Sequence, residues 1–237
     1  MSAESLEELR KKAEEGEAAA QCDLGLRYAK GDGVSKDSVE AVKWWRKAAD
    51  QGNAVAQCRL GWMLEQGEGV RPDPAEAARR YRQAADQGDV TGQFNLAVML
   101  QQGAGVPKDV AKAAKWYRKA AEQGDAQAQY NLGAMLQKGE AGPKDATEAV
   151  KWWRKAAEQG DARAQAILGV MCAFGERVPQ NKVEAYKWLE LAAEAGEPGI
   201  AEVRLRVTAA MTPAQIGEAH RLVREFKPKK TAIPANK

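Results

Sequence analysis

A unit of 36 residues recurs along most of this chain and limits the folds it can adopt more than any other feature of the sequence. A glycine marks the end of each unit, and no residue is inserted or deleted between these glycines: Gly16, Gly52, Gly88, Gly124, Gly160 and Gly196. Tandem repeats of about 20 to 50 residues are typical of solenoids, in which each unit buries its apolar side against its neighbours. The spacing therefore predicts one elongated module rather than a set of globular domains.

The first half of each unit has the periodicity of an amphipathic α-helix, which we call helix A. In the unit 53–88 its apolar stripe consists of Ala56, Leu60, Gly61 and Leu64. Asn53 precedes this stripe and is suited to accept a backbone N–H of the first turn as an N-cap. The same position in the later units holds Asp89, Asp125 and Asp161. Gly67 and Gly69 are expected to end the helix and to allow a tight connection.

The second half of each unit predicts another helix, helix B. Asp73 precedes Pro74, which suits the first helical position, and Glu76 follows at the spacing of a capping box. The same pairing recurs as Asp37 with Glu40, Asp145 with Glu148, and Asn181 with Glu184. Neither helix can bury its apolar stripe alone, so we expect A to pack against B and each pair to pack against the next.

Small and large side chains occupy fixed columns of the repeat. Small residues are expected where two helices approach closely: Gly25, Gly61, Gly133 and Gly169 in helix A, with Ala97 as the exception, and Ala41, Ala77, Ala113, Ala149 and Ala185 in helix B. Large side chains fill two columns of helix B: Trp44, Arg80, Trp116, Trp152 and Trp188, then Trp45, Tyr81, Tyr117, Trp153 and Leu189. Their regular helical spacing indicates a packed core rather than a cofactor site.

The patterns A-x-A-Q-x-x-L-G-x-M, G-x-G-V and D-x-x-E-A-x-K-W-W-R-K-A-A resemble the Sel-1-like repeat family, a relative of the tetratricopeptide repeat with a longer connection between its helices. The resemblance covers five tandem units: 17–52, 53–88, 89–124, 125–160 and 161–196. It implies an all-α, right-handed solenoid superhelix of helix-turn-helix repeats. The fourth and fifth units depart from the family pattern at Ala141-Gly142 and Glu176-Arg177, where we expect the loops to follow different paths.

The two ends of the chain are expected to cover the ends of the stack. Residues 1–16 contain a helical stretch, Leu6 to Glu15, that matches helix B and is predicted to be an N-terminal capping helix. Residues 197–226 form an atypical last unit of capping helices, in which Thr212-Pro213 opens the final helix. Residues 227–237 lack apolar periodicity and are predicted to be a disordered basic tail.

Composition narrows the functional classes. The net charge of +3 arises from both signs mixed through every repeat, and the Lys229-Lys230 pair is too short a cluster to indicate nucleic-acid binding. The sequence shows neither a signal peptide nor a transmembrane segment, which favours a cytoplasmic location and leaves secretion without an N-terminal signal open. The oligomeric state stays open, with a monomer favoured. We therefore expect a protein or peptide partner.

The sequence offers no catalytic or metal-binding motif, and we expect no cofactor. His220 is the only histidine, and no Cys-x-x-Cys occurs. Cys22 and Cys58 occupy equivalent positions of successive units and should lie too far apart for a disulfide, while Cys172 replaces a core leucine. One secreted, cysteine-rich branch of the resembled family has been linked to penicillin binding and hydrolysis, but its repeats each contain a cysteine pair. This chain has no such repeat, so a hydrolase is the disfavoured alternative to a non-enzymatic protein.

The resemblance also implies where a partner would bind, because helix A lines the concave face in this superfamily. The expected groove residues are Arg59, Trp62, Phe94, Asn95, Gln101, Gln127, Tyr130, Asn131, Gln137 and Phe174. Asparagine at the position of Asn95 and Asn131 commonly contacts ligand backbone in peptide-binding tetratricopeptide repeats, and its amide can both donate and accept. Two alternatives stay open: Trp62 and Phe94 pack between neighbouring A helices, and the asparagines are solvated or bonded within their repeat. The function predicted is a scaffold or adaptor that binds a peptide or protein segment.

Overall fold

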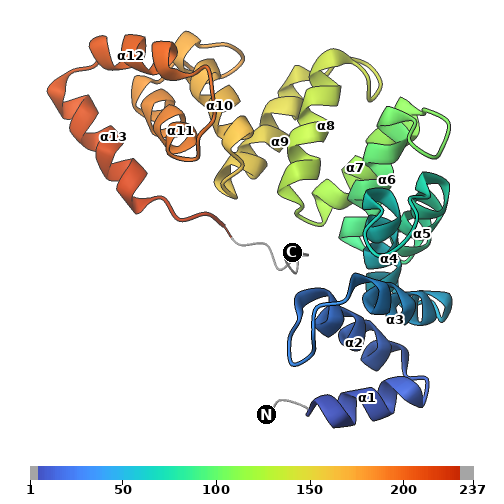
Figure 1. Cartoon of the computed structure of the whole chain (residues 1–237). Helices are drawn as coiled ribbons and strands as arrows, with labels where there is room; N and C mark the ends of the chain where they lie inside the picture. Colours follow the sequence, from blue (N-terminus) through green and yellow to red (C-terminus); the bar gives the residue numbers. More distant parts are fainter. Residues whose placement is uncertain (1–4, 230–237) are drawn as a thin grey trace. The chain divides into compact units, whose positions relative to one another are not determined.

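The computed structural model describes residues 5–229, and these residues form thirteen α-helices without a β-strand (Figure 1). The chain divides into two compact units, Met1–Trp116 and Tyr117–Lys237, with the boundary inside α7 (Val110–Glu122). Unit 1 begins with α1 (Leu6–Glu14), α2 (Ala18–Lys30), α3 (Ser38–Asp50), α4 (Ala54–Gln66), α5 (Pro74–Asp86) and α6 (Val90–Gln102). Unit 2 continues with α8 (Ala126–Lys138), α9 (Ala146–Glu158), α10 (Ala162–Phe174), α11 (Lys182–Glu194), α12 (Ala201–Ala209) and α13 (Pro213–Glu225).

The repeat predicted from the sequence is present as alternating helices of equal length. The A helices are α2, α4, α6, α8 and α10, the B helices are α3, α5, α7, α9 and α11, and each of them has 13 residues. Successive helices pack on one another from α1 to α6 and from α8 to α12, and α13 packs on α11, so the chain is an all-α solenoid built from helix pairs.

The predicted N-caps of the A helices form. Asn53 accepts from the backbone N–H of Ala56 at 2.9 Å, and Asp125 accepts from that of Ala128 at 2.6 Å. Asp89 and Asp161 cap α6 and α10 in the same way. Each cap satisfies a donor that the first helical turn leaves without a partner, which explains why short polar residues recur at this position.

The predicted capping boxes of the B helices are wrong in their second half. Asp73 accepts from the N–H of Glu76 as expected, but the N–H of Asp73 already donates to the carbonyl of Leu64 in the preceding A helix. The carboxylate of Glu76 instead accepts from Arg46 of the preceding repeat at 2.9 Å. Glu148 similarly accepts from Arg118 and from Trp152. A tertiary contact has therefore replaced the local one.

The connection between helices A and B depends on backbone that favours glycine. Gly67 ends α4 at a φ of 72°, and Gly69 follows at 70°. A Cβ on Gly69 would collide with the backbone of Ser38 in the preceding repeat. In the fifth repeat Arg177 takes this left-handed conformation, with a φ of 61°, whereas in the fourth repeat the positive φ has moved to Gly142. The expected change of path thus occurs in the fourth loop, and the fifth keeps a strained version of the usual one.

The predicted close approach of helices A and B is observed. A Cβ on Gly25 would lie 2.7 Å from the Trp45 ring, and one on Gly133 would lie 2.6 Å from the Trp153 indole nitrogen. The Trp153 N–H donates to the carbonyl of Tyr130 at 3.2 Å, which fixes the ring against α8. Glycine is required here because the indole occupies the space of a side chain.

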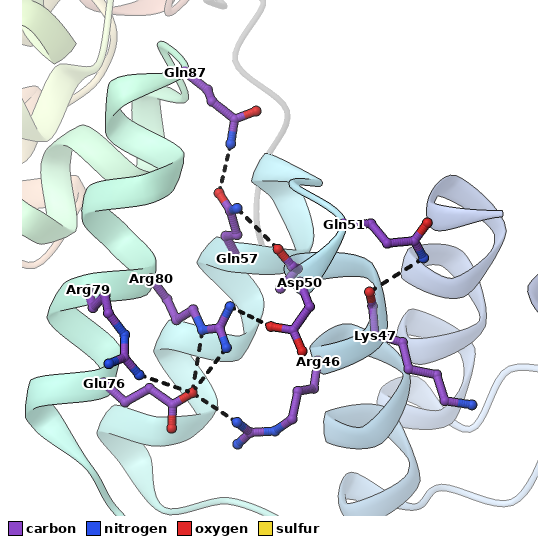
Figure 2. A network of polar contacts seen from close by, with 10 residues as sticks. Arg46, Lys47, Asp50, Gln51, Gln57, Glu76, Arg79, Arg80 and Gln87 are labelled. Carbon is purple, nitrogen blue, oxygen red and sulfur yellow. Dashed lines mark hydrogen bonds and ion pairs between the residues drawn. The ribbon is translucent and has the colours of Figure 1, made fainter. Parts of the chain in front are cut away.

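A column of buried glutamines joins each repeat to the one before it. Gln57 is 3% exposed, donates to the carbonyl of Ala49 at 3.2 Å and accepts from Gln87 at 2.8 Å (Figure 2). Gln129 makes the equivalent bonds with Ala121 at 3.0 Å and Gln159 at 2.8 Å. The column thus links the C-terminal ends of two successive B helices through the A helix between them.

The first large-residue column of helix B is mainly core. Trp116, Trp152 and Trp188 are buried, and Trp44 is half-buried. Arg80, which replaces tryptophan in α5, is also buried and lies 2.8 Å from Asp50 and 3.3 Å from Glu76 (Figure 2). Two carboxylates therefore compensate the positive charge of Arg80, as burial of a charge requires.

The last two helices, α12 and α13, follow the fifth repeat, and residues after α13 contact the repeats. Phe226, after α13, packs edge-on against Trp188 with ring centroids 5.7 Å apart. The backbone N–H of Lys229 donates to the carbonyl of Glu158, and its ammonium lies 2.6 Å from the Glu158 carboxylate. Residues 230–237 of the predicted tail lie outside the described residues. None of the helices within 5–229 is long and apolar enough to cross a membrane.

Replacing Gly133 by alanine is expected to destabilise the fold by about 1–3 kcal/mol, because the new methyl group must displace the Trp153 indole. The matched control is Gly217→Ala in α13, where a Cβ would have no other atom within 4 Å. That change should stabilise by about 0.5–1 kcal/mol, since glycine is the weaker helix former. Urea unfolding of both variants measures the two free energies, and destabilisation of equal size would contradict the packing described.

Gln129→Leu should lower the free energy of unfolding by about 1–3 kcal/mol, because it removes the side-chain donor to the carbonyl of Ala121 and the acceptor of the Gln159 amide. Gln127→Leu, on the exposed side of the same helix, should change it by less than about 0.5 kcal/mol. Thermal unfolding of the two variants beside the native protein tests the role of the glutamine column. Equal stability of the two would show that the buried amide contributes nothing.

The three cysteines are buried and free, so they should react with a thiol reagent only after unfolding. Burial raises the pKa of Cys22 to about 11, and burial also raises the pKa of Cys58 and Cys172. At pH 8 the thiol form therefore predominates at all three positions, and the thiolate is the reactive form. We expect no rapid labelling of the folded protein and three labelled thiols in denaturant. Rapid labelling of one thiol in the folded state would contradict this burial.

Candidate protein-interaction surface

The predicted groove residues form two sets, one in each compact unit. The first set, the unit 1 A-face, consists of Arg59 and Trp62 on α4 and of Phe94, Asn95 and Gln101 on α6. The second set, the unit 2 A-face, consists of Gln127, Tyr130, Asn131 and Gln137 on α8 and of Phe174 on α10. All ten side chains are exposed or half-buried, and the leucines between them on the same helices are buried.

Trp62 is the most prominent residue of the unit 1 A-face. It is 47% exposed and, within the described part of the chain, makes no hydrogen bond or ring contact. Its column otherwise holds Leu26, Val98, Ala134 and Val170. The exposure does not fit the alternative in which Trp62 packs between neighbouring A helices, because such packing would bury most of the ring.

Two further side chains share the side of α4 that carries Trp62. Val55, seven residues before Trp62, is 41% exposed, and the guanidinium of Arg59 lies 5.7 Å from the Trp45 ring. Residues at this spacing lie one above another along a helix. Val55 belongs to a helix A column but is not among the predicted groove residues, because a valine at such a position carries no signal until its exposure is known.

The neighbouring A helix, α6, contains no charged residue. It packs against α4 and contributes the half-buried Phe94, Asn95 and Gln101 to the unit 1 A-face. The helix B of the fourth repeat, α9, has in contrast Glu148, Lys151, Arg154, Lys155 and Glu158. A surface of amides and apolar groups loses less hydration energy on contact than a charged one, and interface cores are accordingly depleted of charge.

Tyr130 of the unit 2 A-face is partly covered by an arginine. The guanidinium of Arg163, from the next A helix, lies 4.1 Å from the centroid of the Tyr130 ring. Arg163 is held in this position by Asp161, whose carboxylate oxygen is 2.8 Å from it. The ring is thus half-buried in a cation–π contact, and its remaining surface faces solvent.

Asn131 has a partner within its own unit. Its side chain forms a hydrogen bond with the hydroxyl of Tyr117 on α7. Burial raises the pKa of Tyr117 to about 12, and the bond from Asn131 opposes part of that rise. This contact fits the alternative in which Asn131 serves the fold, whereas Gln127 and Gln137 on the same helix are exposed.

Phe174 lies at the end of α10 and is 46% exposed. The guanidinium of Arg206 on α12 lies 5.7 Å from its ring centroid. Arg206 is not among the predicted groove residues, because α12 lacks the glutamine and the Leu-Gly pair that assign residues to columns. Only the packing of α12 on α10 places this arginine beside the aromatic ring.

The histidine and the three cysteines are not part of the two A-faces. Within residues 5–229 no group of His, Cys, Asp or Glu side chains is arranged to hold a metal ion. His220 lies with its Nε2 2.9 Å from the Tyr186 hydroxyl. The buried cysteines have raised pKa values, so they lack the thiolate character of a nucleophile. What the two A-faces can offer is aromatic contact and amide hydrogen bonding.

Comparisons with known proteins agree with this architecture. The Sel1 repeat model matches five segments that cover most of the chain: 18–53, 54–89, 90–125, 126–161 and 162–197. A Sel1 repeat protein from Oxalobacter formigenes is similar in structure, with a TM-score of 0.75 and 31% identity over 91% of this chain and 89% of that protein. A protective antigen of uropathogenic Escherichia coli with an SLR fold has a TM-score of 0.64 and 32% identity over 93% of this chain.

The chain is shorter than two of its relatives. It covers 55% of the Escherichia coli antigen. The secretory immunoglobulin A-binding protein EsiB of Escherichia coli O6:H1 is 50% identical over 40 residues, which are 17% of this chain and 8% of EsiB. Sel1-repeat proteins are generally non-enzymatic scaffolds for protein–protein interaction. Because the repeat model accounts for most of its length, the chain belongs to the Sel1 repeat family.

Proposed function

We propose that the unit 1 A-face and the unit 2 A-face each bind a peptide or protein segment, so that the chain acts as a scaffold or adaptor without catalysis. The observation that carries this proposal is Trp62, a large aromatic side chain that is 47% exposed beside the uncharged helix α6. Tryptophan is among the residues that contribute most to binding energy at protein interfaces. Leaving it in water costs hydrophobic free energy that a partner would recover.

The distribution of exposed apolar side chains supports the same surface. The large hydrophobic residues with high exposure are Val39, Val55, Trp62, Phe174 and Leu205. Both aromatic residues of this set lie on A helices, and Val55 lies on the same helix as Trp62. The amides of Asn95, Gln101, Gln127 and Gln137 would then bond the backbone of an extended segment, since each can donate and accept. We also propose that the A helices line the concave groove that the family resemblance implies.

The surface of the B helices is less suited to a polyanion such as nucleic acid. A basic column does run along these helices at Lys43, Arg79, Lys115, Lys151 and Lys187. An acidic column accompanies it at Asp50, Asp86, Glu122, Glu158 and Glu194. Ion pairs such as Arg46 with Glu76 at 2.9 Å neutralise further charge. The potential outside these helices is therefore mixed in sign, whereas nucleic-acid binding needs a continuous positive field.

The relatives support a protein as the class of partner. The name of EsiB records binding to secretory immunoglobulin A, which is a protein. Because only a short segment of EsiB matches this chain, the immunoglobulin itself is not carried over. The hydrolase alternative has no support in the described residues, since no repeat contains two cysteines.

The test is a selection of short peptides on the native full-length chain from a displayed random library. Affinities of the recovered peptides are then measured by titration calorimetry against the native chain and Trp62→Ala. We expect Trp62→Ala to lower the affinity of most peptides that bind the unit 1 A-face about tenfold or more. This loss corresponds to about 1.4 kcal/mol of binding free energy.

The matched control is Val39→Ala, which removes a side chain of similar exposure, 49%, from helix B of the first repeat. It should leave the affinities unchanged, and both variants should keep the thermal stability of the native chain. Peptides whose binding depends on Val39 but on no A-face residue would place recognition on the B helices and contradict the proposal.

A further inference from the structure

Two large apolar side chains of unit 2 are strongly exposed, one at the end of α10 and one in the middle of α12. Phe174, the last residue of α10, is 46% exposed, and Leu205 on α12 is 67% exposed. The two helices pack against each other, and Arg206 reaches from α12 to within 5.7 Å of the Phe174 ring centroid. We call Phe174 and Arg206 the α10–α12 corner. It combines an exposed aromatic ring with one positive charge.

The charge of Arg206 has no carboxylate partner among the described residues. Other arginines nearby are paired: Arg204 lies 2.9 Å from Glu190, and Arg221 lies 2.6 Å from both Glu218 and Glu225. Glu202 stands four residues before Arg206, at the spacing of a helical ion pair, yet the guanidinium contacts Phe174 instead. Arg206 therefore presents an uncompensated cation beside an aromatic ring.

We propose that the α10–α12 corner binds an acidic side chain that adjoins an apolar side chain on a partner polypeptide. A guanidinium near a ring can still offer its edge N–H groups to a carboxylate, and Arg–carboxylate pairs are often bidentate. Phe174 provides the apolar contact for the neighbouring residue. This inference rests on the proposed function, because it names the chemistry that one part of the unit 2 A-face recognises.

The corner and the unit 1 A-face should differ in their response to salt. The unit 1 A-face contains one charged residue, Arg59, which is half-buried with its guanidinium near the Trp45 ring, and the neighbouring helix α6 has none, so binding there should depend less on ionic strength than binding at the corner. At the corner a single exposed cation carries part of the affinity, so binding should weaken as salt rises. The carboxylate of Glu202 is close in sequence and opposes an acidic ligand, so Glu202→Gln should leave binding equal or tighter.

The experiment uses peptides selected on the native full-length chain and resynthesised with an acetylated N-terminus and an amidated C-terminus. Binding is measured against native, Arg206→Gln and Phe174→Ala chains. Arg224→Gln is the control, since Arg224 is an exposed arginine on α13. We expect a subset of peptides with Asp or Glu next to an apolar residue. Their binding should weaken about tenfold with Arg206→Gln, weaken with Phe174→Ala, and be unchanged by Arg224→Gln.

A double-mutant cycle identifies the contact. Replacing the acidic residue of such a peptide by its amide should cause the same loss as Arg206→Gln, and combining the two changes should add little. Additive losses would overturn the proposed contact. Binding that requires a free terminal carboxylate would also overturn it, because the proposal concerns an internal acidic residue.

The same panel separates this inference from the proposed function. Peptides that depend on Trp62 while none depends on Arg206 would leave the scaffold function standing and refute the α10–α12 corner. Peptides that depend on neither residue, nor on Phe174, would refute both. Thermal unfolding of each variant confirms that a loss of binding reflects the surface rather than the fold.

Discussion

The buried glutamine column is the interaction on which the stacking of this solenoid depends. Gln21, Gln57, Gln93, Gln129 and Gln165 are 3–4% exposed, and each donates to the carbonyl near the end of the preceding B helix. A side-chain amide removed from water is costly unless its hydrogen bonds are made. The next A helix can therefore dock in only one register. An inserted residue in a helix would move the amide off its carbonyl, which is a physical reason for the uninterrupted 36-residue spacing.

Local signals in the sequence predicted most of the fold, and tertiary contacts account for what they missed. The caps at Asn53 and Asp125 could be predicted from residue type and position. The contact of Gly133 with Trp153 could be predicted because a large side chain needs a small residue opposite it. The reciprocal half of the capping box could not be excluded from sequence, because the competing acceptor for the Asp73 N–H is a carbonyl of another helix. The bond from Lys229 to Glu158 is likewise invisible to local sequence signals, since the two residues are far apart in sequence.

The candidate site was less predictable than the fold. Column position placed all ten residues on exposed or half-buried sides of the A helices, but it could not tell an available side chain from an engaged one. Asn131 and Trp62 illustrate the difference: the first is bonded to Tyr117, and the second is 47% exposed without such a partner in the described chain. Arg206 could not be assigned to a column at all, because α12 does not follow the repeat.

Departure from the repeat becomes informative about function only when it is combined with exposure. Arg80 departs from a tryptophan column, yet it is buried, and Asp50 and Glu76 compensate its charge, so the fold explains it fully. Trp62 departs from a column of aliphatic residues and is exposed, so stacking of the repeats does not explain it. Residues shared by all units determine how the repeats pack. An exposed residue that departs from its column is not needed for that packing and can serve partner binding. Helix α6, which packs beside Trp62, has no charged residue, so the surface around this exception loses less hydration energy on contact than a charged B helix such as α9 would.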